Sequence, residues 1–254
     1  MKTRRPILMC VVQYAEELKA GTLTVSDLVG KLDTLGVDGI ELRRELWPNY
    51  THELAAVKEQ IEAADKLVTY ATFSTLFSPD AHAHQRLLHD LDTAKALGSP
   101  LLRVFPGAVP IDVSDAKWAW AHEAVEYAAS LGLLIALENW GKLPGGHLSE
   151  LTYVLHNIPS QSLKVNVDVG NYAMHGEDVL EAIKVLGDRV VYAHLKDKPV
   201  MNGEATTYLG GGAFPMDAIV AALEALPQPI LYCFEFDGDG EAESRIAKSL
   251  AYLR

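Results

Sequence analysis

The sequence predicts an α/β fold, a single (β/α)8 TIM barrel domain over residues 1–254. Eight short apolar segments, rich in branched residues, alternate along the chain with helical segments, and this alternation is typical of a parallel sheet. Eight such units in 254 residues have the size of a closed barrel. An open dinucleotide-binding sheet is disfavoured, because QYAEELKAG, which follows the first strand, contains no GxGxxG turn.

Each expected strand is short and apolar, as strands buried on both faces are. In chain order we expect strands at residues 7–12, 39–42, 67–73, 101–105, 134–137, 163–168, 190–195 and 230–236. Helices are expected between them. In TVSDLVGKLDTLG the apolar residues recur at helical spacing before a terminal glycine, and PDAHAHQRLLHDLDTAKALG, DAKWAWAHEAVEYAASLG and AESRIAKSLAYL follow the same pattern. The longest irregular piece, residues 199–215, is expected to be a mobile loop over one end of the barrel.

The overall composition narrows the class of protein. The net charge is -12, from 34 acidic and 22 basic residues, and such a surface repels the phosphates of nucleic acids. No apolar run approaches the length of a membrane span. The two cysteines form no CxxC pair, so reduced thiols are expected. We therefore expect a soluble, cytoplasmic protein without nucleic-acid or membrane partners.

Polar residues cluster where the expected strands end, and in barrels the carboxyl ends of the strands carry the active site. Because side chains alternate along a strand, those that share a face can be separated from those that pack on the helices. The inward residues on the last four strands are Glu138, Asp168, His194 and Glu235. Further polar or aromatic residues at the same end are Glu41, Arg43, Arg103, Trp140, Asn171 and Lys196.

The four inward residues predict a metal site. Three carboxylates at close range repel one another unless a cation lies between them. Oxygen ligands with one imidazole suit one divalent ion such as Mn2+, Mg2+, Co2+ or Zn2+, whereas a closed structural zinc site prefers sulfur. The alternative is an ion-pair network in which Arg43, Arg103, Lys196 and Lys198 neutralise the carboxylates.

Several segments also resemble a known family. GVDGIELRREL, DTAKALGSPLLRV, IALENWGK, VNVDVGNY, VVYAHLKD and YCFEFDGDG occur in the order and spacing of the xylose isomerase-like barrels, which include sugar (phosphate) isomerases and epimerases. The resemblance covers nearly the whole chain. It implies that Glu138, Asp168, His194 and Glu235 bind one divalent metal, and that Glu138 and Glu235 serve as acid and base. Within the family, ELRREL, Gly145 with Gly146, and the GN pair after Asp168 are similar to an epimerase encoded with 2-ketogluconate utilisation enzymes.

The resemblance implies a metal-dependent sugar isomerase or epimerase that moves a proton beside a carbonyl through a metal-stabilised enediolate. We expect a sugar or keto-sugar substrate, contacted by Glu41, Arg43, Arg103, Trp140, Asn171 and Lys196. Asn171 stands where ketose 3-epimerases have a substrate-binding histidine, and their arginine after the metal histidine has no match, so the sugar stays open. Members are often dimers or tetramers, which makes a homo-oligomer a candidate assembly.

Three other functions are compatible with the same barrel. A dehydratase would use the same site to remove a β-hydroxyl from a keto-sugar or keto-cyclitol. An apurinic endonuclease would need additional histidines after the third and fourth strands, where this chain reads TFSTLF and RVFPG. A non-catalytic sugar-binding barrel would not need all four candidate ligands.

Overall fold

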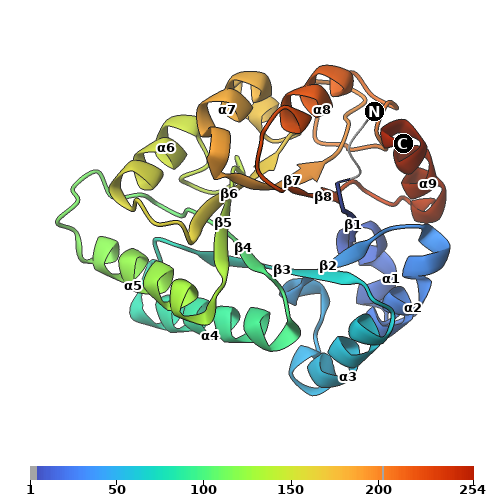
Figure 1. Cartoon of the computed structure of the whole chain (residues 1–254), viewed down its shortest axis with the longest axis horizontal. Coiled ribbons are helices and arrows are strands. Elements are labelled where there is room, and N and C mark those ends of the chain that lie inside the picture. The colour runs from blue at the N-terminus through green and yellow to red at the C-terminus, as the bar shows by residue number, and fades with distance from the viewer. Residues whose placement is uncertain (1–4, 202) are drawn as a thin grey trace.

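The computed structural model describes residues 5–201 and 203–254, so residues 1–4 of the expected domain and one residue of the expected loop 199–215 lie outside it. Eight parallel strands follow one another around a closed barrel, and β1 pairs with β8 to complete it. The helices surround the strands (Figure 1). The predicted (β/α)8 barrel is therefore confirmed.

The strands lie close to where the sequence predicts them, with differences at their ends. They are β1 Ile7–Cys10, β2 Gly39–Arg43, β3 Leu67–Thr75, β4 Leu101–Phe105, β5 Leu134–Glu138, β6 Leu163–Asp168, β7 Val190–Leu195 and β8 Leu231–Phe234. The first strand is shorter than expected, because a 3-10 turn, Val11–Tyr14, begins where the thiol of Cys10 accepts a hydrogen bond from the Val12 amide. Strand β3 is longer and its pairing with β4 shifts register between Ala71 and Thr75.

The helices lie in the connections between strands, except α9, which follows β8. They are α1 Ala15–Ala20, α2 Val25–Leu35, α3 Tyr50–Ala63, α4 Ala81–Leu97, α5 Ala116–Leu131, α6 Leu148–Asn157, α7 Val179–Leu186, α8 Met216–Glu224 and α9 Ala242–Leu253, with short 3-10 segments at Arg44–Leu46, Tyr172–His175 and Gly187–Arg189. Helix α2 shows how the sequence sets the ends: Thr24 and Asp27 form a capping box, and Gly36 ends the helix in the left-handed conformation. None of the helices among the described residues combines the length and apolar character needed to cross a membrane.

Alternation along the strands separates two apolar layers. Outward residues such as Ile40, Leu42 and Leu137 pack in the core between the barrel and the helices. Inward residues form a second, smaller core inside the barrel, made of Leu8, Cys10, Leu101, Ala136, Tyr192 and Cys233. The same alternation turns the polar residues at the strand ends toward the barrel axis, which agrees with the predicted facing.

The burial of the two cysteines in the inner core predicts how their thiols react. Cys10 and Cys233 are free and fully buried, and burial raises the pKa of the Cys233 thiol well above its usual value. Because alkylation requires an accessible thiolate, neither residue is expected to react with iodoacetamide in the folded protein, and both are expected to react in urea. Mass spectrometry counts the adducts. Stoichiometric labelling of the folded chain within minutes would contradict the burial.

The segment that follows β7 is anchored by one carboxylate. Asp197 is fully buried, and its two carboxylate oxygens accept hydrogen bonds from the backbone amides of Lys198, Gly210, Gly212 and Phe214. Its backbone also pairs with Thr207 in both directions, at 3.1 and 2.8 Å. Much of the expected loop is thus tied to the end of β7, next to Lys196.

Candidate metal centre and active site

The four predicted ligands come together at the carboxyl ends of consecutive strands. Glu138 ends β5, Asp168 ends β6, His194 lies on β7 opposite Asp168, and Glu235 follows β8. One potential ligand atom from each residue lies within 4.8 Å of the others, and all four side chains are buried. Neighbouring strands with the same alternation produce this convergence, since each contributes its last inward side chain.

His194 is oriented so that its two ring nitrogens face different groups. Nδ1 lies 3.2 Å from Glu138 Oε2, 3.4 Å from Glu235 Oε2 and 4.0 Å from Asp168 Oδ2. Nε2 points the other way and lies 2.8 Å from Glu41 Oε2. Nδ1 is therefore the nitrogen that faces the carboxylate cluster.

The residues present fit a divalent ion. Nδ1 of His194 is buried and makes no well-directed hydrogen bond to any residue that the structure describes, although three carboxylates surround it. Ligand atoms around one ion are expected about 3–4 Å apart, because each lies about 2.0–2.2 Å from the metal. Three carboxylates with one imidazole are also a donor set that Mn2+, Mg2+, Co2+ or Zn2+ accepts.

Three basic side chains lie against the same carboxylates. Arg103 Nε is 3.0 Å from Glu138 Oε2, and Lys196 Nζ is 2.7 Å from Asp168 Oδ2. Arg43 and Lys196 both pair with Glu235. Three of the four basic residues that the sequence suggested as an alternative thus pair with the candidate ligands, whereas Lys198 Nζ donates to the Gly203 carbonyl at 2.8 Å.

Burial and the neighbouring positive charges have opposite effects on the pKa values of the three carboxyl groups. Burial alone would raise the pKa of both Glu138 and Glu235. The charges of Arg103 and His194 nevertheless lower the pKa of Glu138. The charges of Arg43, Lys196 and His194 lower the pKa of Glu235 well below its usual value. Burial raises the pKa of Asp168 to about 7, against the effect of Lys196. Without a further cation, the three carboxyl groups are therefore not all fully ionised at neutral pH.

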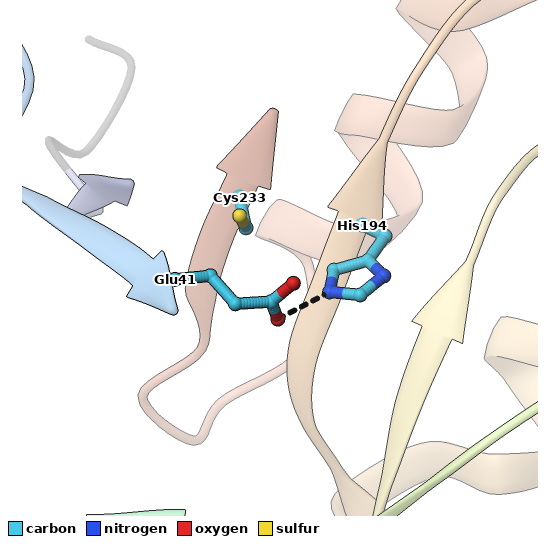
Figure 2. A group of neighbouring side chains, drawn as sticks. All are labelled: Glu41, His194 and Cys233. Atoms are coloured by element: carbon cyan, nitrogen blue, oxygen red, sulfur yellow. Dashed lines mark hydrogen bonds and ion pairs between the residues drawn. The ribbon is translucent and has the colours of Figure 1, made fainter. Parts of the chain in front are cut away.

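Glu41 lies behind His194, on the side away from the other carboxylates. Figure 2 shows Glu41 on β2 and His194 on β7 pointing at each other, with Cys233 of β8 beside them. Oε2 of Glu41 also accepts a hydrogen bond from Tyr192, and Oε1 accepts from Cys10 and Arg43, all between 2.8 and 3.1 Å. Glu41 was expected to contact the substrate; the structure places all its acceptor positions against protein donors.

Burial alone would also raise the pKa of Glu41, but His194, Arg43 and Arg103 hold that pKa well below its usual value. Burial likewise disfavours the charged form of His194, yet the charges of Glu41, Glu235 and Glu138 raise its pKa well above the ordinary value. His194 is thus enclosed by negative charge on both sides, which favours either a proton or a metal ion at Nδ1.

Two asparagines complete the site and were not among the predicted residues. Asn166 on β6 donates from Nδ2 to Glu138 Oε2 at 3.0 Å. Asn139 donates to the Asp168 carbonyl and accepts from the Asp168 amide, at 3.1 and 2.9 Å, which fixes the backbone that carries this ligand. Asn166 has the same facing as Asp168, so strand alternation carried a signal for it, whereas Asn139 lies beyond the end of β5.

The remaining predicted residues lie at the mouth of the barrel. Trp140 forms an aromatic cluster with Phe73 and Phe105, with ring centroids 5.6 and 5.2 Å from its own. The Arg103 guanidinium lies 4.7 Å from the centroid of the Phe105 ring, which links this cluster to Glu138. Asn171 is buried at the turn after β6, where its backbone amide donates a hydrogen bond to the Asp168 carbonyl.

Comparison with solved structures finds the same fold in proteins of low sequence identity. A D-allulose 3-epimerase from Methylomonas sp. in complex with D-allulose aligns with a TM-score of 0.77 and 16% identity, over 98% of this chain and 96% of that one. The probable 3-DHS dehydratase AsbF from Bacillus anthracis aligns with a TM-score of 0.79 and 16% identity, over 98% of each chain. A D-psicose 3-epimerase with D-tagatose, from Clostridium cellulolyticum H10, aligns with a TM-score of 0.76 and 17% identity, over 98% of this chain and 99% of that one.

Sequence comparison gives the family. A search of curated proteins finds no match. The family model described as the xylose isomerase-like TIM barrel matches residues 29–254, which include every strand from β2 to β8 and all four candidate ligands. The chain therefore belongs to the xylose isomerase-like TIM barrel family.

Proposed function

We propose that this protein is a divalent-metal-dependent sugar isomerase or epimerase that transfers a proton at a carbon next to a carbonyl. The convergence of Glu138, Asp168, His194 and Glu235 at the carboxyl end of the barrel carries the proposal, since their ligand atoms lie within 4.8 Å of one another. Membership of the family and the shared fold with two sugar 3-epimerases support it.

The same four residues would hold one ion, through Nδ1 of His194 and one oxygen from each carboxylate. Bound there, the ion would act as a Lewis acid that stabilises negative charge developing on the substrate oxygens. His194 is directed toward that position from β7, and Asn139 fixes the backbone of Asp168.

The proton would be moved by Glu138 and Glu235. Both are buried beside basic groups that keep them ionised, Arg103 for Glu138, and Arg43 with Lys196 for Glu235. An ionised carboxylate can remove a proton from carbon, and the same group, now protonated, can return it to the neighbouring carbon. Return from the other carboxyl group on the opposite face inverts the original carbon. The first route gives isomerisation and the second epimerisation.

Arg43, Arg103, Trp140, Asn171 and Lys196 are the proposed substrate contacts. Lys196 lies between Asp168 and Glu235 and is placed to donate to a substrate oxygen. The aromatic cluster of Trp140, Phe73 and Phe105 offers an apolar surface on which one face of a sugar can pack. The complexes of the two epimerases with D-allulose and D-tagatose support a keto sugar as the substrate class.

Metal removal tests the function. Protein treated with a chelator and incubated with a panel of keto sugars in deuterated water is expected to incorporate no deuterium, and added Mn2+ is expected to restore incorporation at one carbon. Mass spectrometry and proton NMR follow the exchange. A dehydratase would instead release a new ultraviolet-absorbing product. Metal-independent exchange, or purified protein that binds no divalent ion, would refute the proposal.

A further inference from the structure

The side chain of Glu41 makes an unusual set of contacts for a strand-end carboxylate. It is fully buried, and each of its four acceptor positions faces a donor of the protein: Cys10 and Arg43 at Oε1, Tyr192 and His194 at Oε2. A carboxylate has about four such positions, so none is left for a substrate. The contact with His194 joins strands β2 and β7, which are not neighbours in the barrel.

This contact decides which nitrogen of His194 carries a proton. Glu41 Oε2 lies 2.8 Å from Nε2 and acts as an acceptor toward its other partners, so Nε2 must donate. In a neutral imidazole the other nitrogen, Nδ1, then presents its lone pair. Nδ1 is the atom that faces Glu138, Asp168 and Glu235, at 3.2, 4.0 and 3.4 Å.

We propose that Glu41 is a positioning residue for the metal centre: it fixes the ring of His194 and the tautomer in which Nδ1 is the free ligand. This inference rests on the proposed function, because it requires that a divalent ion binds at the four predicted ligands. Carboxylates that hold the second nitrogen of a metal-binding histidine typically contribute about 10–100-fold to metal affinity.

Glu41 extends this role to Glu235 through Arg43. The Nε atom of Arg43 lies 3.1 Å from Glu41 Oε1, while its Nη2 pairs with Glu235 Oε1. The guanidinium therefore holds the catalytic carboxylate at one end and the positioning carboxylate at the other. Tyr192 in turn contacts Thr69 at 2.9 Å, so the orientation of Glu41 is itself fixed from β3 and β7.

The Glu41→Gln variant separates orientation from size. Glutamine has the same shape, but its amide donates hydrogen bonds, so it favours a proton-free Nε2 and moves the histidine proton to Nδ1. We expect the affinity for Mn2+, measured by titration of the apoprotein, to fall about 10–100-fold. The matched control is Asp90→Asn, which removes another buried carboxylate, one that pairs with Arg44 and Ser74 away from the cluster. Its Mn2+ affinity is expected to equal that of the wild type.

The outcomes distinguish this inference from the proposed function. Wild-type protein that fails to bind Mn2+ overturns both. Wild-type protein that binds Mn2+ together with a folded Glu41→Gln variant of equal affinity overturns the role of Glu41 alone, as does an equal loss in Asp90→Asn.

A measurement on the wild type avoids dependence on the folding of a variant. In protein loaded with Zn2+ and labelled with 15N-histidine, NMR is expected to show His194 protonated at Nε2 and bound to the metal through Nδ1. The reverse assignment would overturn the proposal.

Discussion

The Glu235→Gln variant, saturated with Mn2+, is expected to exchange the carbon proton of the sugar that Glu235 deprotonates about 10²–10⁴-fold more slowly than the wild type, because glutamine cannot accept a proton. The amide keeps the shape of the side chain beside Arg43 and Lys196, so the loss reports on proton transfer rather than on packing. Deuterium incorporation measured by NMR gives the rate. The control is Glu204→Gln, an exposed carboxylate of the loop after β7, which is expected to exchange at the wild-type rate.

The variant Glu138→Gln shows which carboxyl group removes the proton from which epimer. If the two carboxyl groups act on opposite faces of one carbon, each variant loses the first proton-removal step for only one of the two epimers. We therefore expect Glu235→Gln and Glu138→Gln to differ in which epimer still exchanges. If the reaction instead interconverts a ketose and an aldose, loss of exchange from both sugars in one variant and from neither in the other indicates a single residue that works on both carbons, as an isomerase requires. A variant that keeps wild-type exchange with both sugars at saturating Mn2+ would exclude its residue from the proton transfer.

Strand alternation explains why the convergence of the four candidate ligands could be predicted from the sequence. Asp168 and His194 are paired residues on neighbouring strands, Glu138 ends the strand on one side, and Glu235 directly follows the strand on the other. In a parallel barrel, adjacent strands with known facing bring their last inward residues together, whatever the loops do. The strand positions needed for this argument follow from apolar runs that are clear in the sequence.

The environment of the cluster was harder to predict, because it depends on side chains that reach across the barrel. Glu41 was placed with the substrate contacts, but only the structure shows that its side chain spans from β2 to His194 on β7. No rule of spacing relates residues on strands that are not neighbours. Asn139 is absent from the predicted site residues for a different reason. It follows the last residue of β5, where strand alternation no longer fixes the direction of a side chain.

The Asp197→Ala variant is expected to lose about 3–5 kcal/mol of unfolding free energy. Each buried amide left without an acceptor costs about 1–3 kcal/mol, and the total is smaller where a water molecule accepts the hydrogen bond instead. Four backbone amides depend on this carboxylate, three of them in the segment from Gly210 to Phe214. Because Asp197 is fully buried, water can reach only some of these amides. Urea denaturation measures the free energy, and the exposed Asp188→Ala serves as the control, with a change expected within about 0.5 kcal/mol.

The anchor at Asp197 also bears on the site, because the residue before it is Lys196, which contacts Asp168 and Glu235. Gly212 packs so closely on Asp197 and Lys198 that a β-carbon there would overlap their atoms. In Asp197→Ala we therefore expect faster proteolytic cleavage within residues 199–215 and a higher KM for the proposed keto-sugar substrate. Loss of stability without faster cleavage would mean that Gly212 and the backbone pairing with Thr207 hold the loop by themselves. In that case the carboxylate would contribute to folding without ordering the end of the barrel where the substrate is proposed to bind.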